Sequence, residues 1–508
     1  MLKRVYAASQ WISVALLALC LPFTSFPAIA RLTGSSMVAP LSGAPMAILL
    51  LIWVIPFLLR NGRLPRQTVI LLVFCVAALV STTAALFIPF PPYKSASPLT
   101  NGLKALVTLG VGLCFYLVVS LWPDEPRRLI FLLRWINWSG VIVVGWSFFQ
   151  VLIWYRFHTY PDWMWAFQGK MSSSLLLYAQ RANGFAYEPS WLAHQLNMLY
   201  LPLWLASTVT GFTAHRIHVG KLHVEHLLLI GGVATLVLSV SRIGLLTFLA
   251  ILAFLILLLN IQWVRQLQNR LTRNISSPQK ARSLRRWFAV GSAVILIVVY
   301  AGMGLGAAYG ISRYDPRMAR LFNFSAMKDS FLYYANQLVF AERIVFWQAG
   351  WGVFNDHPIL GVGLGNAGFF FPEKLSAFSW ALTEVRTLMY QQTALPNIKS
   401  LWVRLLAETG ITGFALFICW CYILWRSAQV LRGQKDRLMR MIGLAGSFVL
   451  IGFIVEGFSL DTFALPYYWF SFGLITAACE IIRRTLIPPA GAMDHPTAND
   501  IAPGALDN

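Results

Sequence analysis

Residues 243–264 read IGLLTFLAILAFLILLLNIQWV, a run of 22 residues without a charged side chain. A helix needs about 20 mostly apolar residues to cross the hydrocarbon core of a bilayer. Arg242 and Arg265 bound the run on its two sides. A helix that is apolar on every face has to be covered by protein or by lipid. This stretch therefore predicts a membrane-spanning helix.

The composition extends this prediction to the whole chain. Of the 508 residues, 58% are hydrophobic and only 12% are charged, whereas soluble domains carry roughly 25% charged residues. In a polar protein, the formal net charge of +21 would suggest a nucleic-acid partner. Here the basic residues form short clusters between apolar runs, which is the pattern of membrane topology. We expect an all-α polytopic membrane protein that binds no nucleic acid.

About twelve apolar runs have the length of a spanning helix. They begin near Gln10, Ala44, Gln67, Asn101, Leu129, Pro189, Val224, Ile243, Trp287, Lys399, Leu438 and Thr462. All six cysteines lie inside such runs and predict small packing residues rather than disulfides or metal ligands. They are Cys20, Cys75, Cys114, Cys419, Cys421 and Cys479.

Lysine and arginine gather in alternate connections between the runs, as the positive-inside rule requires of cytoplasmic loops. These connections contain Lys3/Arg4, Arg60/Arg63/Arg66, Arg127/Arg128, Arg216/Lys221, the stretch 265–286, the stretch 426–440 and Arg483/Arg484. The pattern predicts a bacterial inner-membrane protein with both termini in the cytoplasm. Two long connections, 156–188 and 309–398, then face the periplasm.

The chain accordingly divides into four parts. Spans 1–9 occupy residues 1–308, a large and partly helical periplasmic loop occupies 309–398, spans 10–12 occupy 399–484, and a polar tail follows at 485–508. The composition of the tail predicts disorder. At the N-terminus, Lys3/Arg4, an apolar stretch and Ala28-Ile-Ala30 also fit a cleaved signal peptide. Cleavage would leave eleven spans and the same outer face.

The loop 309–398 is too long for a connector and too aromatic for a disordered linker. Its beginning predicts an amphipathic helix at the membrane surface, with cations toward the headgroups. The residues of this helix are Arg313, Arg317, Arg320, Phe322, Phe324 and Met327. A second helix is predicted from Glu342 to Asn355, with Arg343 on it.

A histidine and a glycine-rich stretch follow this second helix. His357 precedes Pro358, and glycines stand at Gly361, Gly363 and Gly365. Alternate glycines permit close approach of the backbone to a ligand or to a neighbouring helix. The stretch is no dinucleotide fingerprint, because Asn occupies the position of the last glycine and no strand precedes it. A lone histidine in this context is more often structural than catalytic.

Three further charged residues are predicted to lie on the outer face. Arg181 and Glu188 end the loop 156–188, and Arg242 sits in the turn between the seventh and eighth spans. Glu188 before Pro189 also fits a simple helix N-cap, favoured by the helix dipole. Arg242 opposes the positive-inside trend, which calls for a functional explanation.

Together, Arg181, Arg242 and Arg343 with His357 and Glu188 would suit a substrate that carries a phosphate and an acceptor hydroxyl that loses a proton. The sequence contains no evident carboxylate cluster for a metal. We therefore expect chemistry without a metal or another cofactor.

At these residues the chain resembles the O-antigen ligase and O-antigen polymerase (Wzy-type) family of bacterial membrane glycosyltransferases. Four motifs support the resemblance, and together they cover roughly residues 181–413. They are Ser241-Arg242-x-Gly244, Arg343-Ile-Val-Phe-Trp347, His357-Pro-Ile-Leu-Gly361-Val-Gly363-Leu-Gly365-Asn366 and Glu408-Thr-Gly410-Ile-Thr-Gly413. The motif Arg181-x-x-Gly-Phe-x-x-Glu188-Pro-Ser is similar to a variant of exopolysaccharide and capsule polymerases and favours a polymerase. Many members have His-Asn where this chain has Pro396-Asn397, so any role of that histidine is lost here.

The resemblance implies a metal-independent transfer of an oligosaccharide from undecaprenyl diphosphate to an acceptor hydroxyl on the periplasmic side. Arg242, Arg343 and Arg181 would bind the diphosphate, and His357 or Glu188 would assist the acceptor. A polymerase of exopolysaccharide, capsule or O-antigen would use a second lipid-linked glycan as acceptor. A ligase would use lipid A core or protein.

Two other classes of function remain open from the sequence. A transporter or flippase of lipid-linked glycan would normally place ionisable residues near mid-membrane, whereas Arg404, Glu408, Glu456 and Asp461 lie toward the predicted outer ends. A non-catalytic scaffold of an envelope assembly would tolerate the loss of His357, Arg343 or Arg242.

Overall fold

The computed structural model describes residues 2–33, 38–60, 62–220, 222–272, 278–313, 340–392 and 394–486. Helices dominate this part of the chain, and the sheet found in it is a hairpin of two-residue strands, β1 (His218–Val219) and β2 (Leu222–His223). The predicted class of an all-α membrane protein is confirmed.

Within the described ranges, seven helices are long and apolar enough to cross a membrane. They are α5 (Arg66–Ala84), α6 (Pro98–Leu121), α7 (Pro126–Phe157), α12 (Arg242–Thr272), α13 (Pro278–Ser312), α20 (Leu401–Arg432) and α21 (Arg437–Glu456). This number makes the chain a multi-pass membrane protein.

The other five predicted spans also coincide with helices, but these do not reach the same length and hydropathy. The helices are α1 (Leu2–Leu19), the pair α3 (Gly43–Leu49) and α4 (Ile55–Leu59), the pair α9 (Pro189–Gln195) and α10 (Leu201–Thr210), α11 (Val224–Leu238), and α22 (Pro466–Leu486). A π-helical turn joins the two helices of each pair. The total of twelve spans therefore stays a prediction.

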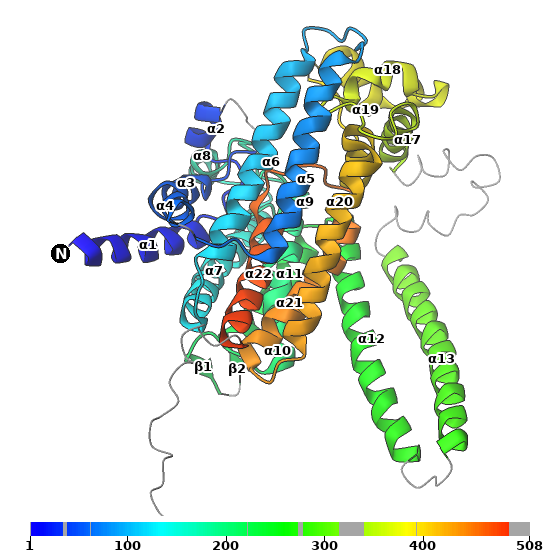
Figure 1. Ribbon diagram of the computed structural model, residues 1–508. Helices are drawn as coiled ribbons and strands as arrows, with labels where there is room; N and C mark the ends of the chain where they lie inside the picture. The colour runs from blue at the N-terminus through cyan, green and yellow to red at the C-terminus, as the bar shows by residue number, and fades with distance from the viewer. Residues whose placement is uncertain are drawn as a thin grey trace, which may run out of the picture.

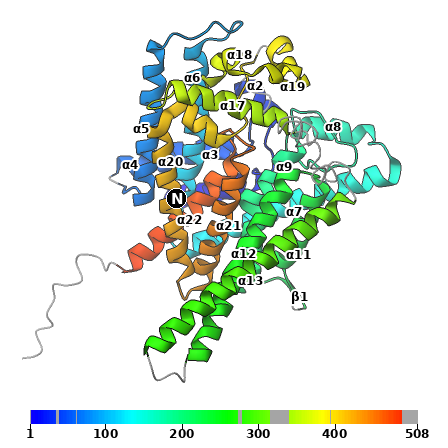
Figure 2. The ribbon, with the colours of Figure 1, turned by 90° about the vertical axis from the view of Figure 1, so that its right-hand side faces the viewer.

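The long helices pack into a bundle with one irregular end. α20 packs against α5 and α21, and α22 packs against α6. α12 and α13 form a hairpin that diverges from the bundle (Figure 1), and Figure 2 shows the same divergence from the side. In Figure 1, α1 runs nearly at right angles to α5 and α6.

Aromatic side chains fill the centre of the bundle. Trp420 of α20 lies 5.5 Å from both Trp469 of α22 and Tyr116 of α6, measured between ring centroids. Gly112 of α6 makes room for this cluster, because a Cβ there would stand 2.2 Å from the indole nitrogen of Trp469. The Tyr116 hydroxyl is hydrogen-bonded to Thr476 at 3.0 Å, so its burial leaves no polar atom unpaired.

Short helices cover one end of the bundle. They are α17 (Ala341–Asp356), α18 (Phe371–Lys374) and α19 (Thr383–Arg386), and they enclose a small core that includes Phe346 and Phe371. The helix predicted at Glu342–Asn355 agrees with α17 to within one residue at each end.

Two boundaries differ from the predicted ones. α13 continues to Ser312, so its last four residues belong to the stretch that the sequence analysis assigned to the large loop. α22 reaches Leu486, two residues into the predicted tail. The predicted interfacial helix, apart from Arg313, and the rest of the tail lie outside the described residues.

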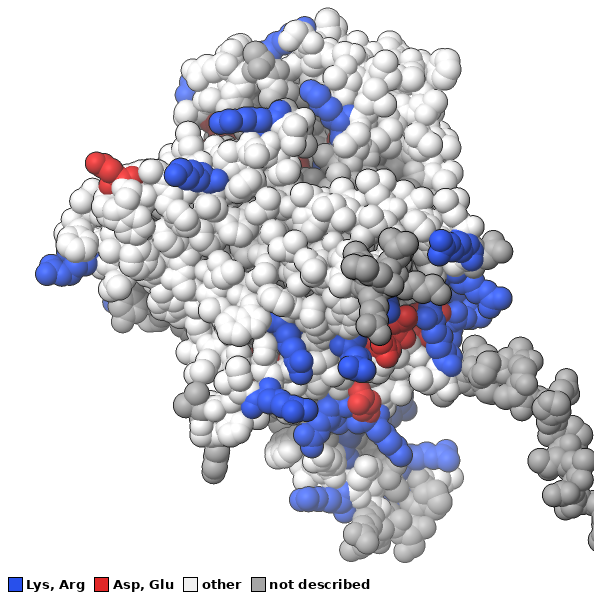
Figure 3. Space-filling view, turned by 90° about the vertical axis from the view of Figure 1, so that its left-hand side faces the viewer, with Lys and Arg blue, Asp and Glu red and all other residues white. Residues whose placement is uncertain are grey.

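The charged side chains avoid the flank of the bundle. On the face that Figure 3 shows, a broad band of surface is uncharged, with lysines and arginines gathered mainly below it and a few above it and at its sides. Lipid covers such a band without cost, whereas charges remain at its edges.

Candidate functional site

The site begins at a break in α20. Gly410 has φ +62° and ψ −170°, which is not a helical conformation, and the helix continues beyond it. A residue with a side chain rarely adopts such a positive φ. A Cβ at Gly410 would also stand 2.2 Å from the backbone oxygen of Ile359. Glycine is therefore required at this position on two counts.

The segment 358–363 takes the hydrogen bonds that the break leaves open. In an unbroken helix, the amides of Ile411 and Thr412 would bond the carbonyls of Ala407 and Glu408. Instead they donate to the carbonyls of Pro358 (2.8 Å) and Ile359 (3.3 Å), while the freed carbonyls accept from the amides of Val362 (3.0 Å) and Gly363 (2.9 Å). Four backbone hydrogen bonds thus connect residues 358–363 to the two sides of the break in α20.

The predicted close approach of the glycine-rich stretch occurs against helices. Gly361, Gly363 and Gly365 have φ values of +69°, +79° and +78°. A Cβ on Gly361 would stand 2.5 Å from the carbonyl carbon of Glu408, and one on Gly365 would stand 2.9 Å from the carbonyl oxygen of Asn101. The three glycines let this stretch lie directly on α20, α5 and α6.

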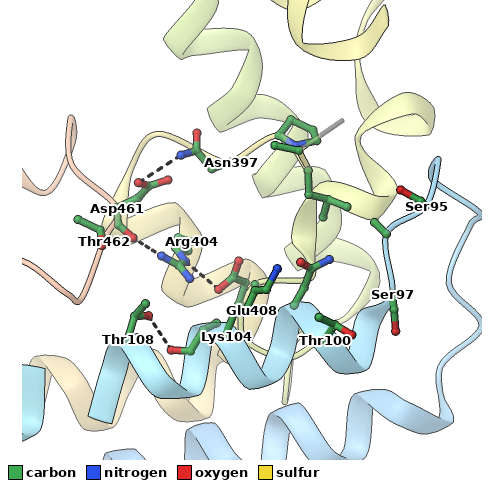
Figure 4. Close-up of a pocket in the computed structure, with 17 residues that line it drawn as sticks. Ser95, Ser97, Thr100, Lys104, Thr108, Asn397, Arg404, Glu408, Asp461 and Thr462 are labelled. Carbon is green, nitrogen blue, oxygen red and sulfur yellow. Dashed lines mark hydrogen bonds and ion pairs between the residues drawn. The ribbon is translucent and has the colours of Figure 1, made fainter. Parts of the chain in front are cut away.

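This docking encloses a cavity of about 610 Å³ between α6 and α20 (Figure 4). Polar side chains from several elements line it. They are Ser95, Ser97, Thr100, Asn101, Lys104 and Thr108 on the α6 side, Asn397 of the loop before α20, Arg404 and Glu408 of α20, and Asp461 and Thr462 after α21. Hydroxyls, amides and charges of this kind are suited to hydrogen-bonding a polar, hydroxyl-rich ligand.

Arg404 and Glu408 form a buried ion pair in the cavity wall. Arg404 Nε lies 2.8 Å from Glu408 Oε2, and the two side chains are only 13% and 6% exposed. Arg404 also donates through Nη1 to the backbone oxygen of Asp461, and the backbone of Gly365 lies next to the Glu408 carboxylate. The pair thereby joins α20, the glycine-rich stretch and the segment after α21.

A second group of charges lies beyond Asp461. The Asp461 carboxylate accepts hydrogen bonds from the backbone amide of Lys399 (3.1 Å) and from Asn397 Nδ2 (3.5 Å). Arg343 Nη1 donates to the backbone oxygen of Ser459 at 3.1 Å. Lys399 has φ +58°, a conformation that is uncommon for a residue with a side chain and that occurs frequently at functional sites.

These cations influence one another and the nearby carboxylates. Burial lowers the pKa of Lys399 to about 8, and the charge of Arg343 lowers it further, against the opposite effects of Asp461 and Glu188. Burial also lowers the pKa of Arg343, while Asp461 and Glu188 raise it. The structure thus brings Arg343 and Glu188, both predicted from the sequence, into one electrostatic neighbourhood with Lys399 and Asp461.

His357 does not join this group. It directly follows the C-terminus of α17, with its ring centroid 5.6 Å from that of Phe370. Arg343 lies near the other end of the same helix, fourteen residues earlier, which corresponds to roughly 20 Å along the axis. The predicted convergence of all five residues therefore does not occur for His357.

Arg181 and Arg242 meet at the turn between α11 and α12. Arg181 Nε donates to the backbone oxygen of Ser239 at 3.0 Å, and Arg242 is the exposed first residue of α12. Glu188 is the N-cap of α9, as the alternative interpretation required, and its carboxylate accepts a hydrogen bond from Ser190 rather than from the helix backbone.

The sequence analysis missed a buried polar cluster beside these residues. Oε1 of Glu456 accepts a hydrogen bond from Asn197 Nδ2 at 3.2 Å, and its Oε2 lies 3.5 Å from His194 Nδ1. Asn197 Nδ2 also donates to the carbonyl of Gly244 at 2.8 Å. His194 and Asn197 stand three residues apart inside an apolar run, and that i, i+3 spacing is the one signal that could have indicated the cluster.

Lys104, Lys399 and Asn397 were not predicted as site residues either. They lie near helix ends and in loops, and their contacts with distant segments leave no local pattern in the sequence.

Within the described ranges, no three His, Cys, Asp or Glu side chains are grouped as metal ligands.

Comparison with known families gives one match, and it covers residues 227–418. The matching family model, Wzy_C, is described as O-antigen ligase. It confirms the family resemblance predicted from the motifs. No curated protein matches the chain. The matched region contains Arg242, Arg343, the glycine-rich stretch, Arg404 and Glu408, whereas Arg181 and Glu188 precede it and Asp461 follows it.

Proposed function

We propose that this chain, similar over residues 227–418 to O-antigen ligases, is a glycosyltransferase that moves an oligosaccharide from undecaprenyl diphosphate to an acceptor hydroxyl on the periplasmic face. The observation that carries the proposal is the polar cavity of about 610 Å³, whose wall residue Asp461 accepts a hydrogen bond from the backbone amide of Lys399, while Arg343 binds the carbonyl of Ser459, two residues before Asp461. A cavity for sugars beside cations for a diphosphate is the arrangement that this reaction requires.

The cations would hold the leaving group. As the bond between the anomeric carbon and the phosphate oxygen breaks, negative charge develops on the diphosphate, and a positioned guanidinium stabilises it. Arg343 would bind it together with Lys399, which would exchange its ion pair with Glu384 for the diphosphate. Arg242 and Arg181, at the turn between α11 and α12, would add further positive charge. This set supplies positive charge without a metal ion.

Glu188 would accept the proton. The acceptor oxygen forms its bond to the anomeric carbon, the diphosphate departs with the electrons of the broken bond, and the hydroxyl proton passes to the carboxylate. We assign this role to Glu188 because its charge acts on Arg343, whereas His357 lies beyond the opposite end of α17. For His357 we propose packing against Phe370.

The identity of the acceptor would separate the two activities of the family. The matched family model is described as O-antigen ligase, whereas the motif from Arg181 to Ser190 resembles that of polymerases. Both activities use the same donor and the same departure of the diphosphate. We therefore propose the shared transfer step and distinguish the two acceptors by experiment.

The test uses the purified full-length chain in lipid with an undecaprenyl-diphosphate oligosaccharide, once with EDTA and once with Mg²⁺. A ladder of longer lipid-linked glycans would establish a polymerase. Transfer that occurs only after lipid A core or a protein acceptor is supplied would establish a ligase. An Arg343→Ala variant serves as the inactive control. Absence of transfer to every acceptor, by protein that is folded and monodisperse, would refute the proposal.

A further inference from the structure

A second cavity, of about 500 Å³, lies between α10, α12, α20 and α21. Its lining combines leucines with arginines and glutamines. The lining residues are Val209, Thr210, Leu255, Leu258, Leu259, Gln262, Gln429, Arg432, Gly433, Arg440 and Leu444.

This cavity lies far from the candidate transfer site. Arg404 stands near the beginning of α20 and Arg432 at its end, and the 28 residues between them correspond to roughly 40 Å of helix. α21 runs in the opposite direction, from Arg440 near its start to Glu456 at its end. The two cavities are therefore at opposite ends of the bundle, and a ligand in one cannot touch the other.

The polar part of this cavity lacks an anion. Arg432 Nη1 donates to Gln429 Oε1 at 2.9 Å, whereas Nε of Arg440 is buried and has no hydrogen-bond partner in the described part of the chain. No Asp or Glu lines the cavity. A buried guanidinium N–H without an acceptor is unfavourable, so a bound anion would stabilise this site.

The remaining wall is apolar. Leu255, Leu258 and Leu259 of α12 face Leu444 of α21 across the cavity. α12 also carries one of the most hydropathic candidate spans in the described part of the chain, so this wall continues along a helix that is suited to contact lipid on its uncovered faces. An anion that fits both parts has a hydrocarbon chain attached to its phosphate, and a basic pocket between helices is a known setting for phospholipid headgroups.

We propose that this cavity binds one anionic phospholipid, with the phosphate between Arg432 and Arg440 and an acyl chain along the leucines. Gln262 and Gln429 are placed to donate hydrogen bonds to the ester or glycerol oxygens. The site is independent of the proposed transferase activity. It joins α12, at the diverging edge of the bundle, to α20 and α21.

The experiment uses full-length protein, delipidated in detergent, and native mass spectrometry with added phosphatidylglycerol. One phosphatidylglycerol is expected to remain bound per chain at low molar excess. Phosphatidylcholine, which carries no net negative charge, and inorganic phosphate, which has no acyl chain, are expected to bind at least tenfold more weakly. The double variant Arg432→Gln/Arg440→Gln should bind phosphatidylglycerol at least tenfold more weakly than the parent chain.

Arg437→Gln is the matched control, because Arg437 is an exposed arginine of the same helix that does not line the cavity. It should bind phosphatidylglycerol like the parent chain. Thermal unfolding in phosphatidylcholine monitors the fold of every variant. Equal binding of phosphatidylcholine, tight binding of phosphate alone, or undiminished phosphatidylglycerol binding by the folded double variant would each overturn the proposal.

Discussion

Arg404 Nε stands 2.8 Å from Glu408 Oε2, one turn farther along α20, and both side chains are nearly enclosed. Because the pair also holds Asp461 and Gly365, it joins three segments that are distant in sequence. The pair therefore contributes to the wall of the polar cavity, together with the backbone hydrogen bonds of residues 358–363.

Glu408→Ala should destabilise the chain by about 3–5 kcal/mol, because it leaves the Arg404 guanidinium buried without its partner. Thermal unfolding in detergent measures the loss. The double variant Arg404→Met/Glu408→Leu should regain most of the stability and yet remain inactive. A single variant as stable as the parent would mean that the pair contributes little.

Gly410→Ala should prevent the docking of residues 358–363, since a Cβ there meets the Ile359 carbonyl at 2.2 Å and the φ of +62° is unfavourable for alanine. We expect a loss of folded protein, measured by size-exclusion chromatography. Gly110→Ala is the control, because nothing lies within 4 Å of a Cβ at that helical position. Equal yields of the Gly410→Ala and Gly110→Ala proteins would show that the docking of residues 358–363 does not require glycine at position 410.

Arg343→Ala should lower kcat/KM for the lipid-linked donor by roughly 10²–10³, the usual effect of removing one donor to a developing anion. Arg343→Lys should restore only part of it, because an ammonium lacks the planar fork. Arg386→Ala, at an exposed arginine of the same loop, should leave the kinetics unchanged. Unaltered kinetics in the Arg343→Ala variant would show that Arg343 does not bind the diphosphate of the donor.

Glu188→Gln should reduce kcat by at least roughly 10², a typical contribution of a general base, while donor binding persists. His357→Ala should retain most of the activity, because His357 lies beyond the far end of α17 from Arg343. Single-turnover transfer and donor binding are measured for both variants. The reverse pattern would assign the proton transfer to His357.

Donor binding should weaken as the pH rises through about 8. The buried Lys399 has its pKa lowered to about 8, so it is charged below that pH and loses its charge above it. We expect the KM for the donor to rise by roughly tenfold from pH 7 to 9.5, in line with the loss of one charged hydrogen bond. Lys399→Arg should flatten the profile, because arginine stays protonated. An unchanged dependence of KM on pH in the Lys399→Arg variant would show that Lys399 is not the group that titrates.

The sequence was sufficient wherever the information is local. The apolar run 243–264 lies in α12, and the helix predicted at Glu342–Asn355 is α17. The glycine positions predicted close approach without saying to what, since a ligand and a helix place the same demand on the backbone. In the structure, Gly361 lies against the backbone of Glu408, so the close approach is to a helix.

The site itself required tertiary information. Arg343 and Glu188 are separated by more than 150 residues, and only the tertiary fold brings them close enough for their charges to interact. His357 was predicted to join them because its loop lies on the same predicted outer face. An intervening rigid helix keeps its two ends apart, however short the sequence separation.

The hydrogen bonding of residues 358–363 to α20 at the Gly410 break also constrains the order of events during biogenesis. Residues 358–363 are synthesised before residues 407–412. Without residues 358–363, the carbonyls of Ala407 and Glu408 could pair only with the amides of Ile411 and Thr412 in an unbroken helix, because a break at Gly410 that left them unpaired in lipid would cost several kcal/mol per group. α20 can therefore adopt its broken form only once residues 358–363 are in place.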